Sequence, residues 1–384
     1  MNASPARLLV VIGTRPDAIK MAPVVEALRA APGFEVVVCA SGQHRELLAP
    51  VLADLALTPD LTLPAPAASA SLGATCASLV GAFDDCLART QPTRVIVQGD
   101  TNTCFAASLA AFYRGVPLAH VEAGLRSARL DAPWPEEFNR RVVTLAADLH
   151  FAPTATAAQA LLDEGVPDAR IHVTGNTVVD ALFATRARLD ADAELARRAA
   201  ADLPRPAPGR RLIAATLHRR EAIGHELEGM CLALRDLVAR QPLDVALPVH
   251  GNPEVRAAIE RILGGVTGIH LLAPLGYLAF VTLLRRAWVV VTDSGGVQEE
   301  APSLDVPVVV ARNVTERSEL VVAGGAVLAG TARGSIVSAV ESLLADEARY
   351  HAMQVAPNPF GDGHAAARIV DVLRRDGAAS APAA

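Results

Sequence analysis

The first thing this 384-residue sequence lacks is a set of paired cysteines. Its five cysteines are scattered and include no CxxC pair; they are Cys39, Cys76, Cys86, Cys104 and Cys231. An odd number of dispersed cysteines in a long chain favours a reduced, cytoplasmic protein over a disulfide framework. The sequence also lacks any spacing of ligand residues typical of a metal site, so we predict no metal.

The sequence also lacks an excess of basic residues and any long apolar run. The formal net charge is -6, with 35 Lys and Arg against 41 Asp and Glu. This balance argues against a nucleic-acid partner, which would need a basic face. The N-terminus lacks the basic region followed by an apolar region that is typical of a signal peptide. The apolar runs are also shorter than the ~20 residues of a membrane span. We therefore predict a soluble protein with no membrane partner, in which an anionic substrate meets locally placed cations.

What the sequence does contain is an alternation of short β-branched runs with helical segments. Runs such as LLVVI and VIV are continuously apolar, as is typical of strands buried on both faces of a parallel sheet. Strands are predicted at residues 8–12, 36–39, 95–97, 118–121, 149–151 and 171–173, and again at 212–216, 244–249, 269–272, 288–292, 307–310 and 326–328. The sequence therefore predicts an α/β protein.

The two sets of strands predict two Rossmann-like, doubly wound domains of similar size. The first covers residues 1–180 and the second residues 181–363, with a helix predicted over 181–203. The Ala/Ser/Pro-rich tail, residues 377–384, is predicted to be disordered. Ligands of such folds bind outside the carboxyl ends of the strands. Functional residues are therefore expected there, in a cleft across which the two domains face each other.

Two charged motifs follow predicted strands of the first domain. In GTRPDAIKMAP (13–23), Arg15 and Lys20 supply cations beside a helix start, which suits a phosphate or carboxylate. A surface arginine at an ordinary strand–helix turn is the simpler alternative. The motif is not GxGxxG, so a nicotinamide cofactor is not indicated, and we predict no cofactor for this protein. In QGDT (98–101), Asp100 ends a strand, either as a site residue or as the cap of the next helix.

Two acidic motifs come next. In HVEAGLRS (120–127), Glu122 lies at the carboxyl end of a strand. A carboxylate buried there without a partner would be costly, which favours a functional role. In PWPEEFNRR (133–141), Pro135 suits the first turn of a helix, and Glu136 and Glu137 suit its positive end. An ordinary acidic helix start explains this last motif at least as well.

Two histidines follow strands of the second domain. His218 begins the cationic run HRREAIG (218–224) after the first of these strands, and His250 ends the run DVALPVH. A single histidine is more often structural than functional. A His-Arg-Arg run at the carboxyl end of a strand favours function, so both histidines are candidates for the cleft.

A glycine turn in TDSGGVQEEAPSLDVPVVV (292–310) predicts a nucleotide-diphosphate site. Its two glycines let backbone N–H groups approach a ligand closely, and the following helix favours anions. A diphosphate on Ser294–Gly296 and a ribose hydroxyl on Glu300 form one coherent site, with a plain glycine turn as the alternative. Arg317, in TERSE (315–319), is expected within reach of the diphosphate.

Taken in order, these motifs resemble the non-hydrolysing UDP-N-acetylglucosamine 2-epimerase family. The resemblance covers almost the whole chain and includes SGQHRELL (41–48), HFAPT (150–154), VTGNTVVDAL (173–182) and NPFGDGHAA (358–366). It implies a fold similar to GT-B glycosyltransferases, without metal or nicotinamide, and a C-terminal helix at 364–376 that packs back on the first domain. It also implies a UDP-sugar substrate and a homodimer.

The family's reaction inverts C2 of the sugar of UDP-GlcNAc to give UDP-ManNAc. UDP is eliminated to leave 2-acetamidoglucal, and UDP then re-adds to the opposite face. The resemblance implies one catalytic histidine, His218, and three catalytic carboxylates, namely Asp100, Glu122 and Glu136. It implies that Phe280 lines the uracil pocket, and it implies a UDP-binding set made of Arg15, Lys20, Ser294, Gly295, Gly296, Glu300 and Arg317.

The chain departs from the family pattern in several places. The single-residue departures are Asp17 for Glu, Leu217 for Gly, Ala222 for Asn and Ser318 for Pro. The stretch LTLPAPAASASL (61–72) lacks the Gln-containing loop with which many bacterial members bind a second UDP-GlcNAc as activator. Gln43 and His44, associated with that allosteric site, are kept. We therefore predict weak or absent activation by UDP-GlcNAc, or a different sugar.

Other functions on the same fold compete with this hypothesis. A 2-epimerase acting on a modified UDP-2-acetamido sugar and a hydrolysing epimerase that releases UDP and ManNAc would share the carboxylates. A GT-B glycosyltransferase would need an acceptor site and usually a membrane-facing patch, which the sequence does not display. A catalytically silent nucleotide-sugar binder is disfavoured because all three carboxylates and the histidine are present.

Overall fold

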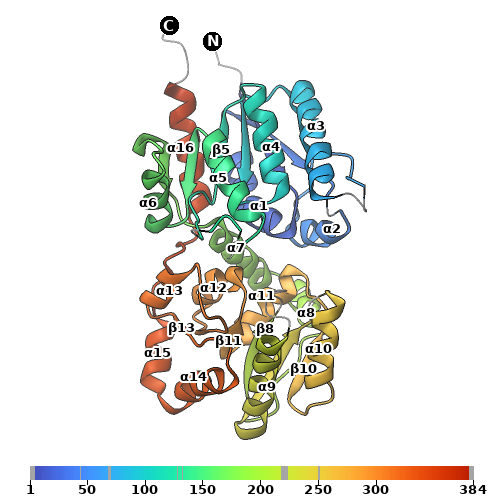
Figure 1. Ribbon diagram of the computed structural model, residues 1–384, viewed down its shortest axis with the longest axis vertical. Helices are drawn as coiled ribbons and strands as arrows, with labels where there is room; N and C mark the ends of the chain where they lie inside the picture. Colours follow the sequence, from blue (N-terminus) through green and yellow to red (C-terminus); the bar gives the residue numbers. More distant parts are fainter. Residues whose placement is uncertain are drawn as a thin grey trace. The chain divides into compact units, whose positions relative to one another are not determined.

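The structure is a computed structural model that describes residues 5–43, 45–67, 71–127, 129–131, 133–217, 224–249 and 251–379. The chain divides into two compact units (Figure 1). Unit 1 comprises Met1–Ala184 and Phe360–Ala384, and unit 2 comprises Thr185–Pro359. The chain therefore enters unit 2 a few residues after the predicted boundary at 180 and returns to unit 1 a few residues before the predicted boundary at 363.

Unit 1 is built on a seven-stranded sheet in which all neighbouring strands run parallel, in the order β3-β2-β1-β4-β5-β6-β7. The order reverses beside β1, which pairs with both β2 and β4, as in doubly wound folds. The strands are β1 (Ala6–Ile12), β2 (Phe34–Ala40), β3 (Leu61–Thr62), β4 (Arg94–Gln98), β5 (Leu118–Val121), β6 (Leu149–Ala152) and β7 (Ile171–Val173).

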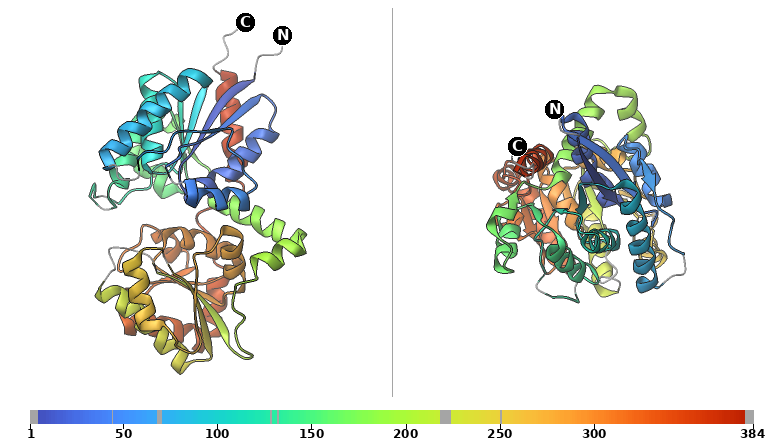
Figure 2. Two further views of the ribbon diagram at one scale, coloured as in Figure 1. Left: turned by 90° about the vertical axis from the view of Figure 1, so that its right-hand side faces the viewer. Right: turned by 90° about the horizontal axis from the view of Figure 1, so that it is seen from above.

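Helices connect successive strands and cover both faces of this sheet (Figure 2). The C-terminal helix packs against the first helix of the chain, so the final segment is part of unit 1. The helices are α1 (Arg15–Ala30), α2 (Arg45–Asp54), α3 (Leu72–Thr90), α4 (Asn102–Tyr113), α5 (Glu136–Ala146), α6 (Ala155–Asp163), the short 3-10 helix η1 (Asp168–Arg170), α7 (Thr177–Ala191), which continues into unit 2, and α16 (Ala365–Ala379).

Unit 2 repeats this plan on a six-stranded parallel sheet, in the order β10-β9-β8-β11-β12-β13. Its strands are β8 (Arg211–Thr216), β9 (Leu243–Pro248), β10 (Ile269–Leu272), β11 (Val289–Thr292), β12 (Val308–Val310) and β13 (Ala326–Leu328). Its helices are α8 (Ala193–Ala199), α9 (His225–Arg240), α10 (Pro253–Leu263), α11 (Tyr277–Arg286), α12 (Gly295–Glu300), the 3-10 helix η3 (Ala301–Leu304), α13 (Ser318–Val322), α14 (Arg333–Ala345) and α15 (Glu347–Gln354).

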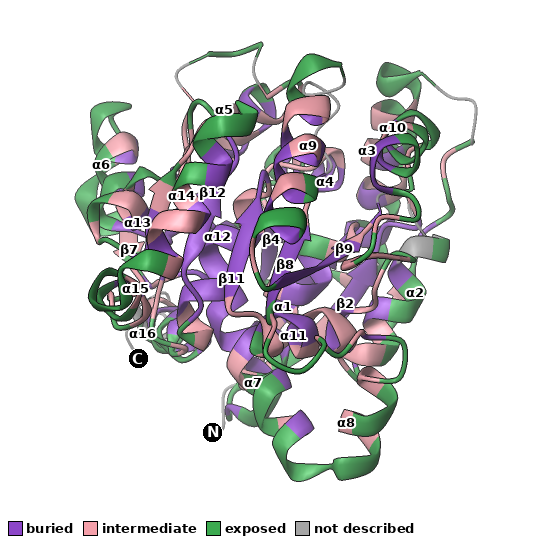
Figure 3. Cartoon of the chain, turned by 90° about the horizontal axis from the view of Figure 1, so that it is seen from below, coloured by how far each residue is buried: buried purple, intermediate pink, exposed green. Residues whose placement is uncertain are grey.

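The central strands of both sheets are buried on both faces (Figure 3). Residues 8–12 of β1 are at most 3% exposed, and every residue of β4, β11 and β12 is buried. Burial on both faces explains why these strands are continuously apolar rather than alternating. The prediction of an α/β fold with two parallel sheets is confirmed. None of the helices in the described ranges has the length and apolar character needed to cross a membrane.

Three local predictions differ from the structure. The tail predicted to be disordered from residue 377 begins too early, because α16 continues to Ala379. The single helix predicted over 181–203 is wrong, because α7 ends at Ala191 and α8 begins at Ala193. Asp192 separates the two helices because its carboxylate accepts the N–H groups of Glu194 and Leu195 and so caps α8. Strand β3 lies outside the predicted set, because two residues are too few to show any hydrophobic periodicity.

Candidate functional site

The carboxyl ends of β1, β4 and β5 lie at one edge of the unit 1 sheet. Strand β4 stands between the other two, and the segments that follow the three strands carry Thr14, Asp100 and Glu122. Neighbouring strands lie only about 4.8 Å apart, so the side chains at these strand ends are held near one another. The sheet therefore gathers two of the predicted carboxylates, Asp100 and Glu122, at the edge where ligands of doubly wound folds bind.

Glu122 is buried at this edge in a strained backbone conformation. Its φ is 64°, in the left-handed region that residues other than glycine rarely adopt, and it is only 8% exposed. Its Oε1 forms an ion pair with Nζ of Lys20 and accepts from Nδ2 of Asn176 at 3.0 Å. Its Oε2 accepts from Nε2 of Gln98. Buried carboxylates need such partners, and backbone strain clusters at functional sites.

Helix α1 brings Lys20 to Glu122 because a capping box fixes its first turn. The side chain of Thr14 accepts the N–H of Asp17, and the Asp17 carboxylate accepts the N–H of Thr14. Arg15, the first residue of the helix, is partly exposed. Lys20 follows five residues later with its side chain 11% exposed. In this structure, the predicted anion-binding lysine is directed at a carboxylate.

Asp17 links the start of α1 to the loop that carries Asp100. Its carboxylate accepts the N–H groups of Gly13 and Thr14, both at 3.0 Å, and it lies 3.5 Å from the hydroxyl of Thr101. Burial raises the pKa of Asp17 to about 6. The hydrogen bonds from Thr14 and Gly13 oppose that rise, and the negative charge of Asp100 adds to it. Asp17 therefore changes its charge in mildly acidic solution, close to a predicted catalytic carboxylate.

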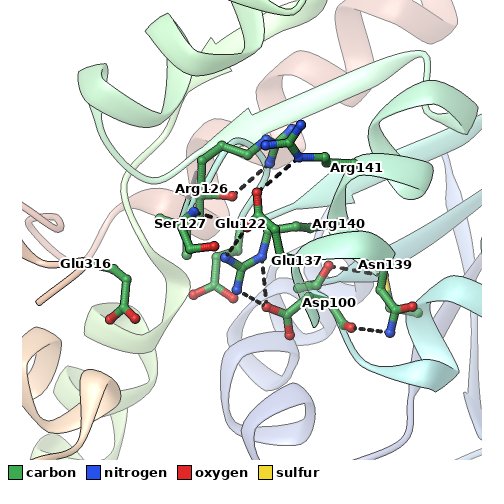
Figure 4. Close-up of polar contacts among 12 residues, drawn as sticks. Asp100, Glu122, Arg126, Ser127, Glu137, Asn139, Arg140, Arg141 and Glu316 are labelled. Atoms are coloured by element: carbon green, nitrogen blue, oxygen red, sulfur yellow. Dashed lines mark hydrogen bonds and ion pairs between the residues drawn. The ribbon is translucent and has the colours of Figure 1, made fainter. Parts of the chain in front are cut away.

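Asp100 is paired with an arginine that lies outside the predicted set. Nε and one terminal nitrogen of Arg140 lie 3.1 Å and 2.5 Å from Oδ2 of Asp100 (Figure 4). Asn139 donates to the main-chain oxygen of Asp100 at 2.9 Å. Burial lowers the pKa of Arg140, but the negative charges of Asp100 and Glu137 outweigh that effect and raise it. Helix α5 thus fixes this loop, and the NRR run three to five residues after Glu136 indicates cations but not the carboxylate that they bind.

The adjacent glutamates of α5 have different surroundings. Glu137 is fully buried and its carboxylate accepts from Arg140, from Arg141 and from the N–H of Ser127, each at 3.1 Å (Figure 4). Glu136 is partly exposed. Residues four apart share a helix face, so Glu136 lies on the same face as Arg140, which reaches Asp100. The contacts of Glu137 are those of a structural residue, whereas Glu136 is partly exposed at the start of the helix that carries Arg140.

A buried histidine supports the loop that carries Asp100. Nε2 of His120 lies 2.8 Å from the carbonyl oxygen of Gly99, a residue with a φ of 69°. Burial lowers the pKa of His120 to about 3, so the neutral ring donates its Nε2–H to that carbonyl. A histidine inside an apolar strand gives no sequence signal of such a role, and the contact becomes visible only in the folded sheet.

Gln43 lies in the loop after β2 and is joined to the same edge. Its Oε1 accepts from the hydroxyl of Thr103 at 3.1 Å, and that hydroxyl also lies 2.9 Å from Oγ of Ser41. A Cβ added to Gly13 would lie 2.1 Å from the same hydroxyl oxygen. Close packing against Thr103, rather than turn geometry, therefore requires glycine at position 13. His44, the companion of Gln43 in the predicted allosteric site, lies outside the described residues.

The Ser-Gly-Gly turn of unit 2 follows β11 and opens α12. Ser294 occupies the N-cap position, and its N–H donates to the hydroxyl of Thr292 at 2.9 Å. Gly295 lies against the guanidinium of Arg317, since a Cβ at that position would stand 3.0 Å from Cζ. Gly296 is partly exposed. The structure therefore brings the predicted diphosphate turn and the predicted diphosphate-binding arginine together.

Carboxylates hold the guanidinium of Arg317. Oε1 of the buried Glu299 lies 2.9 Å from Nε and 2.8 Å from a terminal nitrogen, and Glu316 lies 3.7 Å away. Burial raises the pKa of Glu316, but hydrogen bonds and the charge of Arg312 prevail and bring it to about 2. Glu316 is therefore ionised, and the guanidinium of Arg317 is oriented before any ligand is present.

The remaining predicted residues of unit 2 lie on α11 and α12. Glu300 is 6% exposed, and its carboxylate accepts from the hydroxyl of Tyr277 at 3.0 Å. Tyr277 begins α11, the helix that also carries the partly exposed Phe280. The predicted ribose-binding residue, Glu300, therefore lies on α12, and the predicted uracil-lining residue, Phe280, lies on α11. The hydrogen bond from Tyr277 to Glu300 joins these two helices.

His218 and His250 both lie outside the described residues. Strand β8, which precedes the first of them, ends at Thr216, and its hydroxyl oxygen lies 2.5 Å from that of Thr292 at the end of β11. Within the described ranges, no group of three or more His, Cys, Asp or Glu side chains is arranged to hold a metal ion.

Comparisons with known proteins agree across both units. Residues 26–374 match the family described as UDP-N-acetylglucosamine 2-epimerase. The UDP-N-acetylglucosamine 2-epimerase of Escherichia coli strain K12 is 46% identical over 371 residues, which are 96% of this chain and 99% of that protein.

Solved structures give the same result. The UDP-GlcNAc 2-epimerase from Neisseria meningitidis, solved with UDP-GlcNAc, has a TM-score of 0.92 at 39% identity and covers 96% of this chain and 100% of that one. A Staphylococcus aureus protein solved with UDP has a TM-score of 0.87 at 38% identity and covers 97% of both chains. The resemblance inferred from the motifs is thereby confirmed, and the chain belongs to the UDP-N-acetylglucosamine 2-epimerase family.

Proposed function

We propose that this protein is a non-hydrolysing 2-epimerase that interconverts UDP-GlcNAc and UDP-ManNAc. The observation that carries the proposal is Glu122, a buried, ion-paired carboxylate with a left-handed backbone, beside Asp100 at the carboxyl edge of a parallel sheet. Relatives solved with UDP-GlcNAc or UDP support the class of substrate. UDP is eliminated to leave 2-acetamidoglucal and re-adds to the opposite face.

The carboxylates of unit 1 carry out the proton transfers. H2 of the sugar is not acidic, so a positioned base removes it while the C1–O bond breaks and its electron pair leaves with UDP. Re-addition forms the C1–O bond again and returns a proton to C2 from the other face. Asp100, Glu122 and Glu136 are the groups proposed for these steps and for stabilising positive charge at C1. Lys20 and Arg140 form ion pairs with Glu122 and Asp100 and so orient the two carboxylates.

Residues of unit 2 bind UDP in this proposal. Negative charge develops on UDP as it leaves, and fixed cations and backbone N–H groups stabilise such charge. Retaining UDP after cleavage makes its re-addition effectively intramolecular. The proposed binding residues of unit 2 are Phe280, Ser294, Gly295, Gly296, Glu300 and Arg317, together with His250, which follows from the sequence alone. His218, which also follows from the sequence alone, is the proposed catalytic histidine.

The cytoplasmic protein acts as a homodimer in this proposal, and an apolar surface on α4 and α5 supports the dimer. Phe112 and Tyr113 are 60% and 72% exposed on α4, and Phe138 and Leu145 are 49% and 84% exposed on α5. The two helices pack side by side (Figure 1). Exposed apolar patches of this kind mark association surfaces, and a two-fold axis would let the same patch cover itself.

Light scattering coupled to size-exclusion chromatography tests the dimer. Leu145→Glu is expected to give a monomer, because it places charge in the patch. The control is Val322→Glu, a charge placed at an 87% exposed residue of α13, which is expected to leave the dimer intact. A monomeric natural protein, or a dimeric Leu145→Glu variant, would contradict this assignment.

Incubation with UDP-GlcNAc in D2O tests the reaction. NMR is expected to show deuterium entering C2 while UDP-ManNAc forms, because elimination exchanges that hydrogen with solvent. Absence of both changes would overturn the proposal. Release of free ManNAc would instead identify a hydrolysing epimerase, and the same assay with other UDP-2-acetamido sugars would identify a shifted substrate.

Two variants test the proposed carboxylates in the same assay. Asp100→Asn and Glu122→Gln are expected to abolish deuterium exchange while UDP affinity, measured by calorimetry, stays near that of the natural protein. The control is Glu35→Gln, which removes a solvent-exposed carboxylate paired with Arg7 and is expected to retain full activity. A near-normal rate for Glu122→Gln would remove Glu122 from the mechanism.

A further inference from the structure

Two segments that are far apart in the sequence pack against each other beside Glu122. Gly175 and Asn176 follow β7, while Phe360 and Gly361 belong to the returning chain. The N–H of Asn176 donates to the carbonyl oxygen of Phe360 at 2.6 Å. A Cβ added to Gly175, whose φ is 90°, would lie 3.3 Å from Cα of Gly361. The backbones therefore pack closely at Gly175, where a side chain would be both crowded and strained, and this contact fixes the main chain of Asn176.

The side chain of Asn176 is fixed as well. The residue is 2% exposed. Its Oδ1 accepts the N–H of Val178 at 3.1 Å, and its Nδ2 donates to Oε1 of Glu122 at 3.0 Å. Since a backbone N–H can only donate, the oxygen of the amide must face Val178. The NH2 group must then face the carboxylate, so the amide has one orientation.

We propose that Asn176 is a positioning residue for Glu122, an inference that rests on the proposed 2-epimerase activity. Asn176 and Lys20 share Oε1 of Glu122, while Gln98 binds Oε2. Donors on both oxygens fix the plane of the carboxylate as well as its position. Asn176 is itself held by the returning chain at Phe360, so the segment NPFGDGHAA supports the reacting carboxylate through one residue.

The charges around Glu122 make this role measurable. Lys20 on α1 is its ion-pair partner, and Arg140 on α5, Cys104 on α4 and His120 on β5 also interact with its charge. Asn176→Asp keeps the shape of the side chain, the acceptor for Val178 and the backbone bond to Phe360. It changes only the donor facing Glu122, which becomes a second negative charge. Ionising both carboxylates together is unfavourable.

Steady-state kinetics of the full-length protein across a range of pH test the proposal. Asn176→Asp is expected to lower kcat roughly 100-fold, as a misplaced reacting group does, with little change in KM for UDP-GlcNAc. The acid limb of its pH–rate profile is expected to move up by about one pH unit or more. Asn176→Ala is expected to lower kcat without moving that limb, because it removes the donor and adds no charge.

A control separates positioning from loss of structure. Asp180 accepts the N–H groups of Ala365 and Ala366 at the start of α16, in the same returning segment, and within the described ranges it makes no hydrogen bond to Glu122. Asp180→Asn is expected to lower the melting temperature while leaving the acid limb in place. Equal pH profiles for all variants, or a normal kcat for both Asn176 variants, would overturn the role of Asn176. A natural protein that exchanges no deuterium would instead overturn the proposed function itself.

Discussion

The adjacent glutamates of α5 allow structure and chemistry to be separated by two matched substitutions. Glu137→Gln is expected to destabilise unit 1, whereas Glu136→Gln is expected to reduce turnover and leave stability nearly unchanged. The difference arises because Glu137 is fully buried beside two arginines, whereas Glu136 is partly exposed at the start of α5. Each substitution removes one negative charge and preserves the shape of the side chain.

The loss of stability expected for Glu137→Gln follows from the contacts of the Glu137 carboxylate. Arg140, Arg141 and the N–H of Ser127 each donate to its carboxylate at 3.1 Å. Removing one member of a buried ion pair costs about 3–5 kcal/mol, because the partner charge stays buried. In the variant, Arg140 still has its ion pair with Asp100, and Arg141 can be hydrated because its side chain is 39% exposed. The loss therefore falls at the lower end, about 3 kcal/mol, which corresponds to a fall in melting temperature of roughly 6–12 °C for a unit of this size.

Thermal unfolding by circular dichroism and deuterium exchange at C2 measure the two effects. Glu137→Gln is expected to have a lower melting temperature than the natural protein. At temperatures well below its melting temperature, it is expected to retain more turnover than Glu136→Gln. A melting temperature for Glu137→Gln within about 2 °C of the natural protein would refute the energetic argument. A Glu136→Gln variant that loses as much stability as Glu137→Gln would show that the two glutamates are not distinguished by burial.

Three further predictions concern other parts of the two units. The raised pKa of Asp17 means that its stabilising contribution is complete below its ordinary value of 3.8 and is lost as the pH rises through about 6. Urea unfolding should therefore show a loss of about 3 kcal/mol over that range, and Asp17→Asn should lack it. Gly13→Ala should cost about 1–3 kcal/mol in the same assay, since its Cβ would overlap Thr103, and an unchanged midpoint would contradict the packing. Arg317→Ala should weaken UDP binding about 10-fold or more, and calorimetry showing unchanged affinity would exclude Arg317 from the UDP site.

The strands of the fold were predictable because a strand that is buried on both faces consists almost entirely of apolar residues. β1, β4 and β11 read as unbroken apolar runs since helices cover both faces of each sheet. The break between α7 and α8 was not predicted, because Asp192 also fits within a long helical pattern. Only the capping hydrogen bonds of Asp192 reveal the boundary. β3 left no periodic signal at all.

The candidate site divides in the same way. Glu122 and Asp100 were predictable because each stands where a strand ends. Arg140 and Asn176 were not, because their roles depend on contacts with residues 40 and 54 positions away. Within PWPEEFNRR, the family resemblance implies Glu136 as the catalytic residue, and only the structure shows that the buried ion pairs belong to Glu137.

The sequence by itself determined the α/β class, the two parallel sheets, the strand ends that carry Asp100 and Glu122, and the family. These properties depend on local composition and on the order of motifs along the chain. Only the tertiary structure decided that Lys20 and Asn176 hold Glu122 and that Arg317 rests on Gly295. Those contacts join residues from separate elements, so hydrogen-bond geometry and burial in the folded chain, rather than residue spacing, determine which groups meet.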